Sequence, residues 1–108
     1  MGDTNYFSGV VKVLENPKQT LVNHKIAIAT FRVKIAQNRG NKIVPLVVWG
    51  NLASQVQHYY QKNDYILIEG YLSIRKKRTR MGKVDNFQKT TLTALKIYPF
   101  FLQSKTGL

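Results

Sequence analysis

Residues 42–77 read KIVPLVVWGNLASQVQHYYQKNDYILIEGYLSIRKK, and their pattern predicts three consecutive elements of the fold. Residues 42–49 are nearly all apolar and rich in valine, which predicts a buried strand. Residues 51–60 repeat apolar side chains every three to four positions, which predicts one short helix. Residues 65–77 alternate apolar and polar side chains, which predicts a strand with one buried face. The stretch is therefore strand, helix, strand, and the rest of the chain must supply partners for both strands.

The ends of these elements carry their own signals. Gly50 closes the first strand, and Asn51 is the predicted N-cap of the helix. Lys62–Asp64 ends the helix. In the following strand Ile66, Ile68, Leu72 and Ile74 share one phase around Gly70, which predicts a single buried face along its whole length.

Three further strands are predicted outside this stretch. Tyr6–Leu14 is apolar and β-branched, and Lys25–Gln37 alternates in two runs, Ile26 and Ile28 in one phase and Phe31, Val33 and Ile35 in the other. The apolar phase changes within the second of these, which predicts a bulge near Ala29–Thr30. Val84–Tyr98 is a long final strand that Pro99 is expected to stop.

The resulting order is β-β-β-α-β-β, which predicts an all-β protein: a five-stranded OB-fold Greek-key barrel with one short helix between strands three and four. Another small β barrel, SH3-like or a split sandwich, is the alternative. At 108 residues the chain is expected to form one OB-fold domain over residues 1–99, with a short tail over 100–108. It contains no cysteine, so no disulfide or zinc-thiolate framework is available.

The charge is strongly positive and unevenly placed. The chain has 17 Lys and Arg against 5 Asp and Glu, a formal net charge of +12. Six cations fall within nine positions without a carboxylate between them: Arg75, Lys76, Lys77, Arg78, Arg80 and Lys83. A solvated hairpin tip needs only one or two charges, so we expect this cluster to bind phosphate groups. An anionic membrane surface is the rival ligand, but it would call for an amphipathic helix.

Three blocks of the chain carry a family resemblance. Leu46–Ala53 (LVVWGNLA), Tyr60–Asp64 (YQKND) and Ile66–Arg75 (ILIEGYLSIR) resemble the bacterial and organellar single-stranded DNA-binding proteins in residues and spacing. Ala29–Val33 is similar to the second-strand block of that family, so the resemblance covers about residues 6–98. It implies non-sequence-specific binding of single-stranded DNA in replication, recombination or repair, by an OB-fold that assembles as a dimer or tetramer.

The resemblance also assigns roles to single residues. Trp49 falls where the family places a base-stacking aromatic, Arg75 on a position that contacts the nucleic-acid backbone, and Lys62 on the lysine after the helix. Ile43 and Lys77 stand where many members carry stacking tryptophans, which implies weaker, more salt-sensitive binding. The acidic-tipped tail of bacterial members is missing. A second likeness, to the small basic primosomal OB-fold protein of bacteria, follows from these losses.

Other binding residues are expected from their place in the pattern. Trp49 can face outward because Leu46 and Val48, in the opposite phase of the strand, already provide the buried side chains. The alternative is a core position, which is usual for a lone tryptophan in an apolar strand. Tyr71 shares a face with Ser73, Arg75 and Lys77, which suits a nucleic-acid track, with a partly exposed tyrosine as the alternative. Phe87 is a third candidate for stacking, with core packing as its alternative. Arg32 and Lys34 are expected to follow the phosphates.

Catalysis is not expected. The two histidines lack acidic partners in sequence, and no paired carboxylates, metal-ligand spacing or phosphate loop can be assembled, so we predict no enzyme, no cofactor and no metal. No stretch is apolar enough for a membrane span. The expected compartment is the cytoplasm or nucleoid, or a plastid stroma, since many residues come from A/T-rich codons.

One rival function belongs to another class. An OB-fold subunit of a replication or RNA-binding assembly would use its basic surface to meet an acidic protein or structured RNA. A phosphate track should bind oligo(dT) without a partner, whereas an interaction module should not. The sequence leaves DNA and RNA unseparated, because both present the same charges and base faces.

Overall fold

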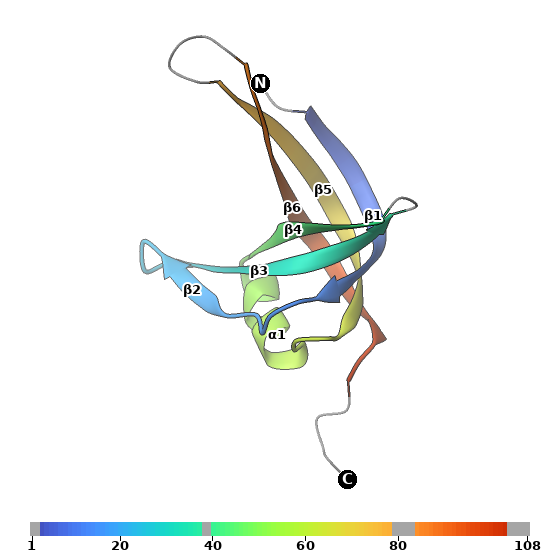
Figure 1. Cartoon of the computed structure of the whole chain (residues 1–108). Helices are drawn as coiled ribbons and strands as arrows, with labels where there is room; N and C mark the ends of the chain where they lie inside the picture. Colours follow the sequence, from blue (N-terminus) through green and yellow to red (C-terminus); the bar gives the residue numbers. More distant parts are fainter. Residues whose placement is uncertain (1–2, 38–39, 79–83, 104–108) are drawn as a thin grey trace.

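Five long strands close into a ring around one apolar core (Figure 1). The structure is a computed structural model that describes residues 3–37, 40–78 and 84–103. Its elements are β1 (Asp3–Val13), β2 (Gln19–Val22), β3 (Ile26–Gln37), β4 (Gly40–Trp49), α1 (Asn51–Tyr59), β5 (Tyr65–Arg78) and β6 (Val84–Phe101). The strand order is β1-β5-β6-β4-β3-β2, and β1 also pairs with β3, which closes the ring. The all-β OB-fold prediction is confirmed.

One short strand was not expected from the sequence. β2 has four residues, and the only strand with which it pairs in the described part of the chain is β3. It joins β3 through a turn in which Asn23 and His24 both have positive φ, and the Lys25 N–H donates to the Val22 carbonyl at 3.1 Å. Most residues of β2 are exposed. An exposed strand does not need alternating apolar side chains, so its sequence carried no strand signal.

The predicted bulge in β3 is wrong. The pairing between β3 and β4 runs without a break from Ile28 opposite Trp49 to Gln37 opposite Gly40. A single phase, that of Ala29 and the alternate residues after it, is buried throughout. The apparent change of phase arose from Ile26 and Ile28, which lie on the side of β3 that faces away from the core. Ile26 is 52% exposed.

The bulges lie between β5 and β6 instead. One shift falls between Glu69 and Gly70, where Leu95 of β6 is the extra residue. Gly70 is required there, because a Cβ atom at this position would stand 1.9 Å from the Thr93 carbonyl oxygen. Close backbone approach of this kind is a recognised use of glycine in a strand.

The end of β6 also differs from the prediction. Pro99 was expected to stop the strand, yet it pairs with Ile66 and the strand continues to Phe101. At this end the described part of the structure pairs β6 with β5 alone. Proline is tolerated where one edge of a strand has no partner, because its missing N–H then breaks no ladder.

Helix α1 covers one end of the barrel and matches the prediction to within one residue. Its buried side chains, Ala53 and Val56, pack into the core. The N-cap is Gly50 and not Asn51: Gly50 has φ 71°, its carbonyl accepts the Ala53 N–H at 3.0 Å, and no side chain caps the helix. A positive φ favours glycine, so the chain turns one residue earlier than expected.

The buried carboxylate of Asp64 links the residues just after β6 to the loop between α1 and β5. Asp64 is 1% exposed and accepts the Gln61 N–H at 2.8 Å and the Gln103 N–H at 2.7 Å. Tyr60 lies nearby, and burial, with a smaller contribution from Asp64, raises the pKa of its hydroxyl above 10.0. The backbone N–H donors compensate the cost of burying this charge.

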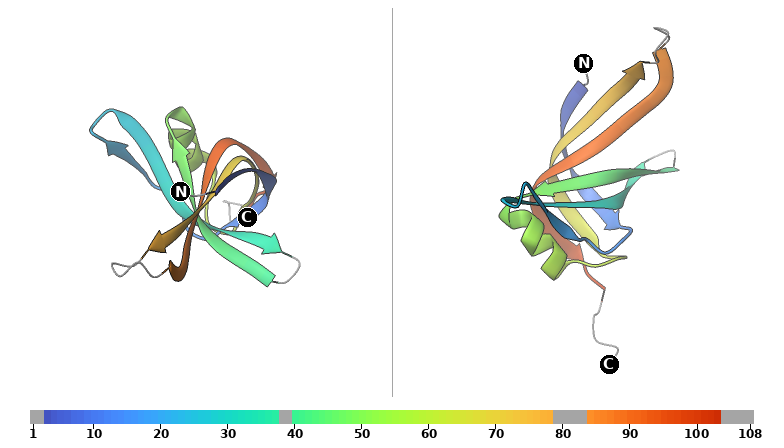
Figure 2. Two further views of the ribbon diagram at one scale, coloured as in Figure 1. Left: turned by 90° about the horizontal axis from the view of Figure 1, so that it is seen from above. Right: turned by 90° about the vertical axis from the view of Figure 1, so that its left-hand side faces the viewer.

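Beyond the ring, β5 and β6 continue as a long hairpin. We define the hairpin arm as residues 71–78 of β5 and 84–93 of β6. Figure 2 shows it diverging from the β3–β4 hairpin, with the start of β1 lying along it. The fold therefore presents two extended hairpins that leave the same barrel in different directions.

Candidate nucleic-acid interface

Alternation along β4 exposes the single tryptophan. Leu46 and Val48 are fully buried, whereas Trp49, in the opposite phase, is 48% exposed. The outward orientation predicted for Trp49 is confirmed, and the core alternative is excluded. We call the side of the sheet that carries Trp49 the outer face. Its exposed indole offers a ring on which a base can stack.

Tyr71 also lies on the outer face, beside an aromatic residue that the sequence pattern did not single out. Tyr71 pairs with Tyr6 of β1, and the two rings meet edge to face with centroids 6.3 Å apart. Both rings remain largely accessible, at 44% and 62% exposure. Tyr6 could have been found by its phase, because Phe7 beside it packs against the core.

The pairing registers join these residues into one surface. Tyr6 lies opposite Tyr71, Tyr71 opposite Thr93, Thr93 beside Val47, and Val47 opposite Thr30. Neighbouring strands lie about 4.8 Å apart, so this row crosses five strands without interruption. Trp49 stands two residues beyond Val47 on the same face. The two predicted stacking residues are thus brought onto one continuous outer face.

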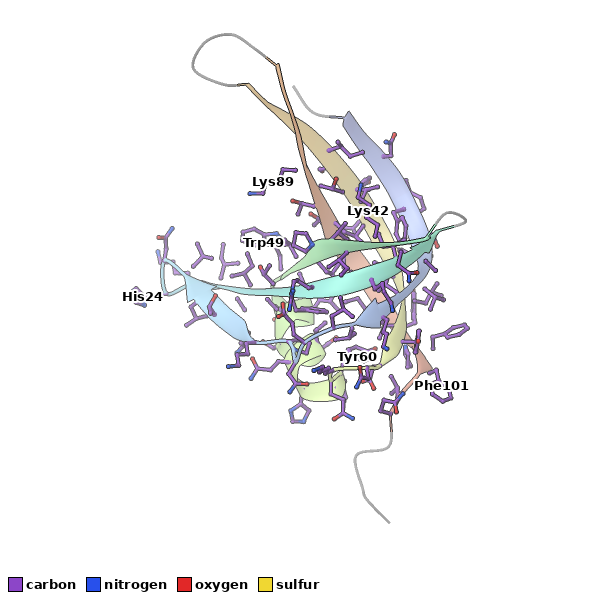
Figure 3. All side chains as sticks on the ribbon, viewed as in Figure 1. His24, Lys42, Trp49, Tyr60, Lys89 and Phe101 are labelled. Carbon is purple, nitrogen blue, oxygen red and sulfur yellow. The ribbon has the colours of Figure 1, made fainter. Side chains whose placement is uncertain are left out.

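A groove lies on this face within the hairpin arm. It has a volume of about 280 Å³ and is lined by Ser73, Lys89, Thr91 and Thr93. The registers place Ser73 directly opposite Thr91, and Lys89 opposite Arg75. In Figure 3, Lys89 and Trp49 project from the same side of the molecule. None of the four was predicted as a site residue, although Thr91 and Thr93 alternate with the buried Leu92 and Ala94.

The cations predicted on β3 share this face. Arg32 and Lys34 lie opposite Pro45 and Ile43 of β4, in the same phase as Trp49. Arg32 has an acidic partner that was not foreseen: its Nε stands 3.4 Å from a Glu15 carboxylate oxygen, and the other oxygen accepts the Arg32 N–H at 2.7 Å. The pair is more than a third exposed, so solvent screens it and the guanidinium stays accessible.

Lys62 is not brought together with the other predicted residues. It lies in the loop between α1 and β5, at the end of the barrel opposite the hairpin arm (Figure 1). Its N–H donates to the Asn16 side-chain oxygen at 2.8 Å, which fixes the loop. The residue is exposed but belongs to a separate part of the surface.

The cationic cluster is described only in part. Its first four residues belong to the backbone of β5, where Arg75 lies opposite Lys89, Lys76 opposite Gln88 and Arg78 opposite Val84. Phe87 belongs to β6. The side chains of Arg75, Lys76, Lys77, Arg78 and Phe87, and the whole of Arg80 and Lys83, lie outside the described residues. The cluster is therefore placed along the hairpin arm by its backbone alone.

The described residues contain neither a metal-ligand cluster nor a membrane-spanning helix. In residues 3–37, 40–78 and 84–103, no three His, Asp or Glu side chains gather closely enough to hold a metal ion. The one helix found in this part of the chain is too short and too polar to cross a membrane.

Comparison with known proteins reveals sequence relatives. The sequence model of the "Single-strand binding protein family" matches residues 10–99. A curated protein of Trieres chinensis, named "Putative single-stranded DNA-binding protein ycf41", is 35% identical over 104 residues, covering 93% of this chain and 92% of its own. Both matches span the outer face and the core together.

Solved structures share the fold. The SSB domain of a protein from Synechococcus sp. superposes with a TM-score of 0.68 at 21% identity, over 87% of this chain and 93% of that one. The second single-stranded DNA-binding protein of Mycobacterium smegmatis gives 0.65 at 21% identity, over 90% and 89%. The mitochondrial single-stranded DNA-binding protein Rim1 of Saccharomyces cerevisiae gives 0.73 at 10% identity, over 94% and 99%. These likenesses extend along nearly all of the chain.

Proposed function

Because the chain belongs to the single-strand binding protein family, we propose that it binds single-stranded DNA without sequence preference. The bound strand follows the outer face. Bases stack on Trp49 and Tyr71, and cations along the hairpin arm and β3 neutralise phosphates.

The observation that carries this proposal is the continuity of the outer face. Exposed rings from β4 and β5 lie on one surface with Lys34 and Arg32 of β3, and the backbone of the cationic cluster extends from it. An aromatic platform beside a cationic track is the combination that proteins use to bind single strands non-specifically. A duplex binds less well, since its bases are already stacked on one another.

The balance of forces is expected to be electrostatic. Ile43, which is 57% exposed on the same face, offers no ring for stacking. With few platforms, most of the affinity must come from phosphate contacts, so binding falls steeply with salt. RNA presents the same charges and base faces and is expected to compete.

Fluorescence of Trp49 tests this function directly, because the chain contains one tryptophan. Oligo(dT) should quench the emission, a duplex of equal length should quench it less, and salt should restore it. The same titration followed by anisotropy of a labelled oligonucleotide measures binding independently of stacking. Absence of binding to oligo(dT) by both signals at low salt would exclude the proposal and favour an interaction module.

The family supports three wider proposals. We expect a role in DNA replication, recombination or repair, where single strands are exposed. We expect a dimer or tetramer, and contacts with other replication proteins. Two observations favour a plastid stroma as the compartment: the ycf41 relative, and a composition rich in amino acids that A/T-rich codons encode.

A further inference from the structure

We propose that the groove in the hairpin arm is a seat for one backbone phosphate of the bound strand. The groove is lined by Ser73, Lys89, Thr91 and Thr93. The proposal rests on the proposed function and deepens it, because it names four further residues that hold the strand where it passes from the stacking platforms to the cationic arm.

The first argument is chemical. Three hydroxyl groups and one ammonium line the groove, and none of the four residues is acidic or aromatic. The lining that the structure describes offers donors but no ring face, so it suits phosphate oxygens better than a base. Serine, threonine and lysine side chains are common donors to nucleic-acid phosphates.

The second argument is that these donors are available. Within the described part of the chain, the side chains of these four residues have no hydrogen-bond or ion-pair partner. Lys89 is exposed, and Ser73, Thr91 and Thr93 are half-buried, so the groove presents preformed hydroxyls beside a long cationic side chain. A charged oxygen that accepts several such donors is held more strongly than by lysine alone.

The third argument is position. Thr93 lies directly opposite Tyr71 and beside Val47, two residues before Trp49. The groove therefore begins at the row that joins the two platforms and extends from it along the arm, on the side away from Trp49. A strand whose bases stack on both rings and whose phosphates continue along the cationic arm passes over it.

The test separates hydroxyl contacts from charge. Thr91→Val keeps the shape of the side chain and removes its hydroxyl, Ser73→Ala removes a second, and Lys89→Gln removes the cation. Thr20→Val and Lys18→Gln are matched controls, because both residues are exposed on or beside β2. Affinity for oligo(dT) is measured by anisotropy over a range of salt, and Trp49 quenching is recorded in parallel.

We expect the combined Ser73→Ala and Thr91→Val variant to bind about tenfold more weakly at fixed salt, with an unchanged salt slope. Lys89→Gln should lower the magnitude of that slope by about 0.7, as expected when one phosphate fewer is neutralised. Neither control should change affinity by more than about twofold. Inorganic phosphate should displace the oligonucleotide from the wild type better than chloride does at equal ionic strength, and this preference should be lost in the combined hydroxyl variant.

Three results would overturn the proposal. If the hydroxyl variants bind like the wild type while oligo(dT) still quenches Trp49, the groove is not a seat although the proposed function stands. If Lys89→Gln alone matters, the residue acts as an isolated charge. If inorganic phosphate displaces the strand equally from the wild type and from the combined hydroxyl variant, the competing anion does not act at the groove. Failure of the wild type to bind oligo(dT) would instead remove the proposed function itself.

Discussion

Single side chains on this protein acquire their roles from the face on which they lie. Trp49 and Val48 are neighbours in sequence, yet one is 48% exposed and the other fully buried. The alternation of a strand makes this separation unavoidable. It also means that the tryptophan can be removed without leaving a cavity in the core.

We predict that Trp49→Ala folds and binds oligo(dT) more weakly by about 1 to 3 kcal/mol, the loss of one stacked base. Thermal unfolding followed by circular dichroism should give a melting temperature close to that of the wild type. Val48→Ala is the contrasting variant, because it opens a cavity and should lower stability instead. A large fall in stability for Trp49→Ala would contradict the assignment of this face.

Gly70 is predicted to be the least replaceable glycine among those described. In Gly70→Ala the new methyl group would meet the Thr93 carbonyl oxygen at 1.9 Å, and backbone on both strands would have to move. We expect a loss of at least about 3 kcal/mol in the free energy of unfolding, measured in urea. Gly9→Ala is the control: its Cβ would meet only the Phe7 ring, at 3.1 Å. Equal stability of the two variants would argue against the close approach.

Tyr60 gives the fold a dependence on alkaline pH. Burial and then Asp64 raise the pKa of its hydroxyl above 10.0, so the unfolded chain loses this proton first. The contribution of Tyr60 to stability is therefore complete below pH 10.0 and is lost as the pH rises through the folded pKa. Urea unfolding between about pH 9 and 11 should show a shallower decline for Tyr60→Phe than for the wild type. An identical decline in both proteins would contradict this.

At the scale of elements, the hairpin arm combines a paired backbone with a run of cationic residues. It is one continuous ladder from Tyr71 opposite Thr93 to Arg78 opposite Val84, with a single irregularity between Lys76 and Arg78. A paired hairpin can hold cations at fixed spacing away from the barrel. Repulsion among them costs stability unless an anion offsets it.

We predict that alanine at Lys76, Lys77, Arg78 or Arg80, one at a time, lowers the salt dependence of binding. The logarithm of the binding constant should fall with log salt by about 0.7 per phosphate neutralised, and each substitution that removes a cation from a phosphate should reduce the slope by that amount. Lys62→Ala is the comparison, because Lys62 lies at the other end of the barrel. Four unchanged slopes would remove the arm's cations from the site.

At the scale of the whole molecule, the described surface leaves apolar area uncovered. Phe100, Phe101 and Leu102 are 65%, 60% and 43% exposed at the end of β6. Among the described strands, residues 3–10 of β1 have a partner on one side only. An open edge and an apolar patch are both relieved by association with a second chain.

We predict a dimer or tetramer of the 12.4 kDa chain in sedimentation at tens of micromolar. Phe100→Ser should shift the distribution toward monomer, because it removes the most exposed ring of the patch. Leu21→Ser, which changes a residue 58% exposed on the β2–β3 hairpin, is the matched control. A monomeric wild type at this concentration would contradict the expected assembly.

The order of the long strands, the short helix and the faces of Trp49 and Tyr71 could all be predicted from the sequence. These follow from periodicity, which is a local property of the chain: a two-residue repeat assigns each side chain to a face before any partner strand is known. The positive charge of the arm could also be predicted from the sequence, since it depends on composition alone.

Features that depend on contacts between distant residues could be read only from the folded chain. The bulge at Gly70, the passage of β6 through Pro99 and the Arg32–Glu15 pair each require a register or a partner that no local pattern contains. The same is true of the groove, because Ser73 and Thr91 meet only once β5 and β6 are paired. Strand pairing is long-range, so a one-residue shift in register would have assembled a different face from the same sequence.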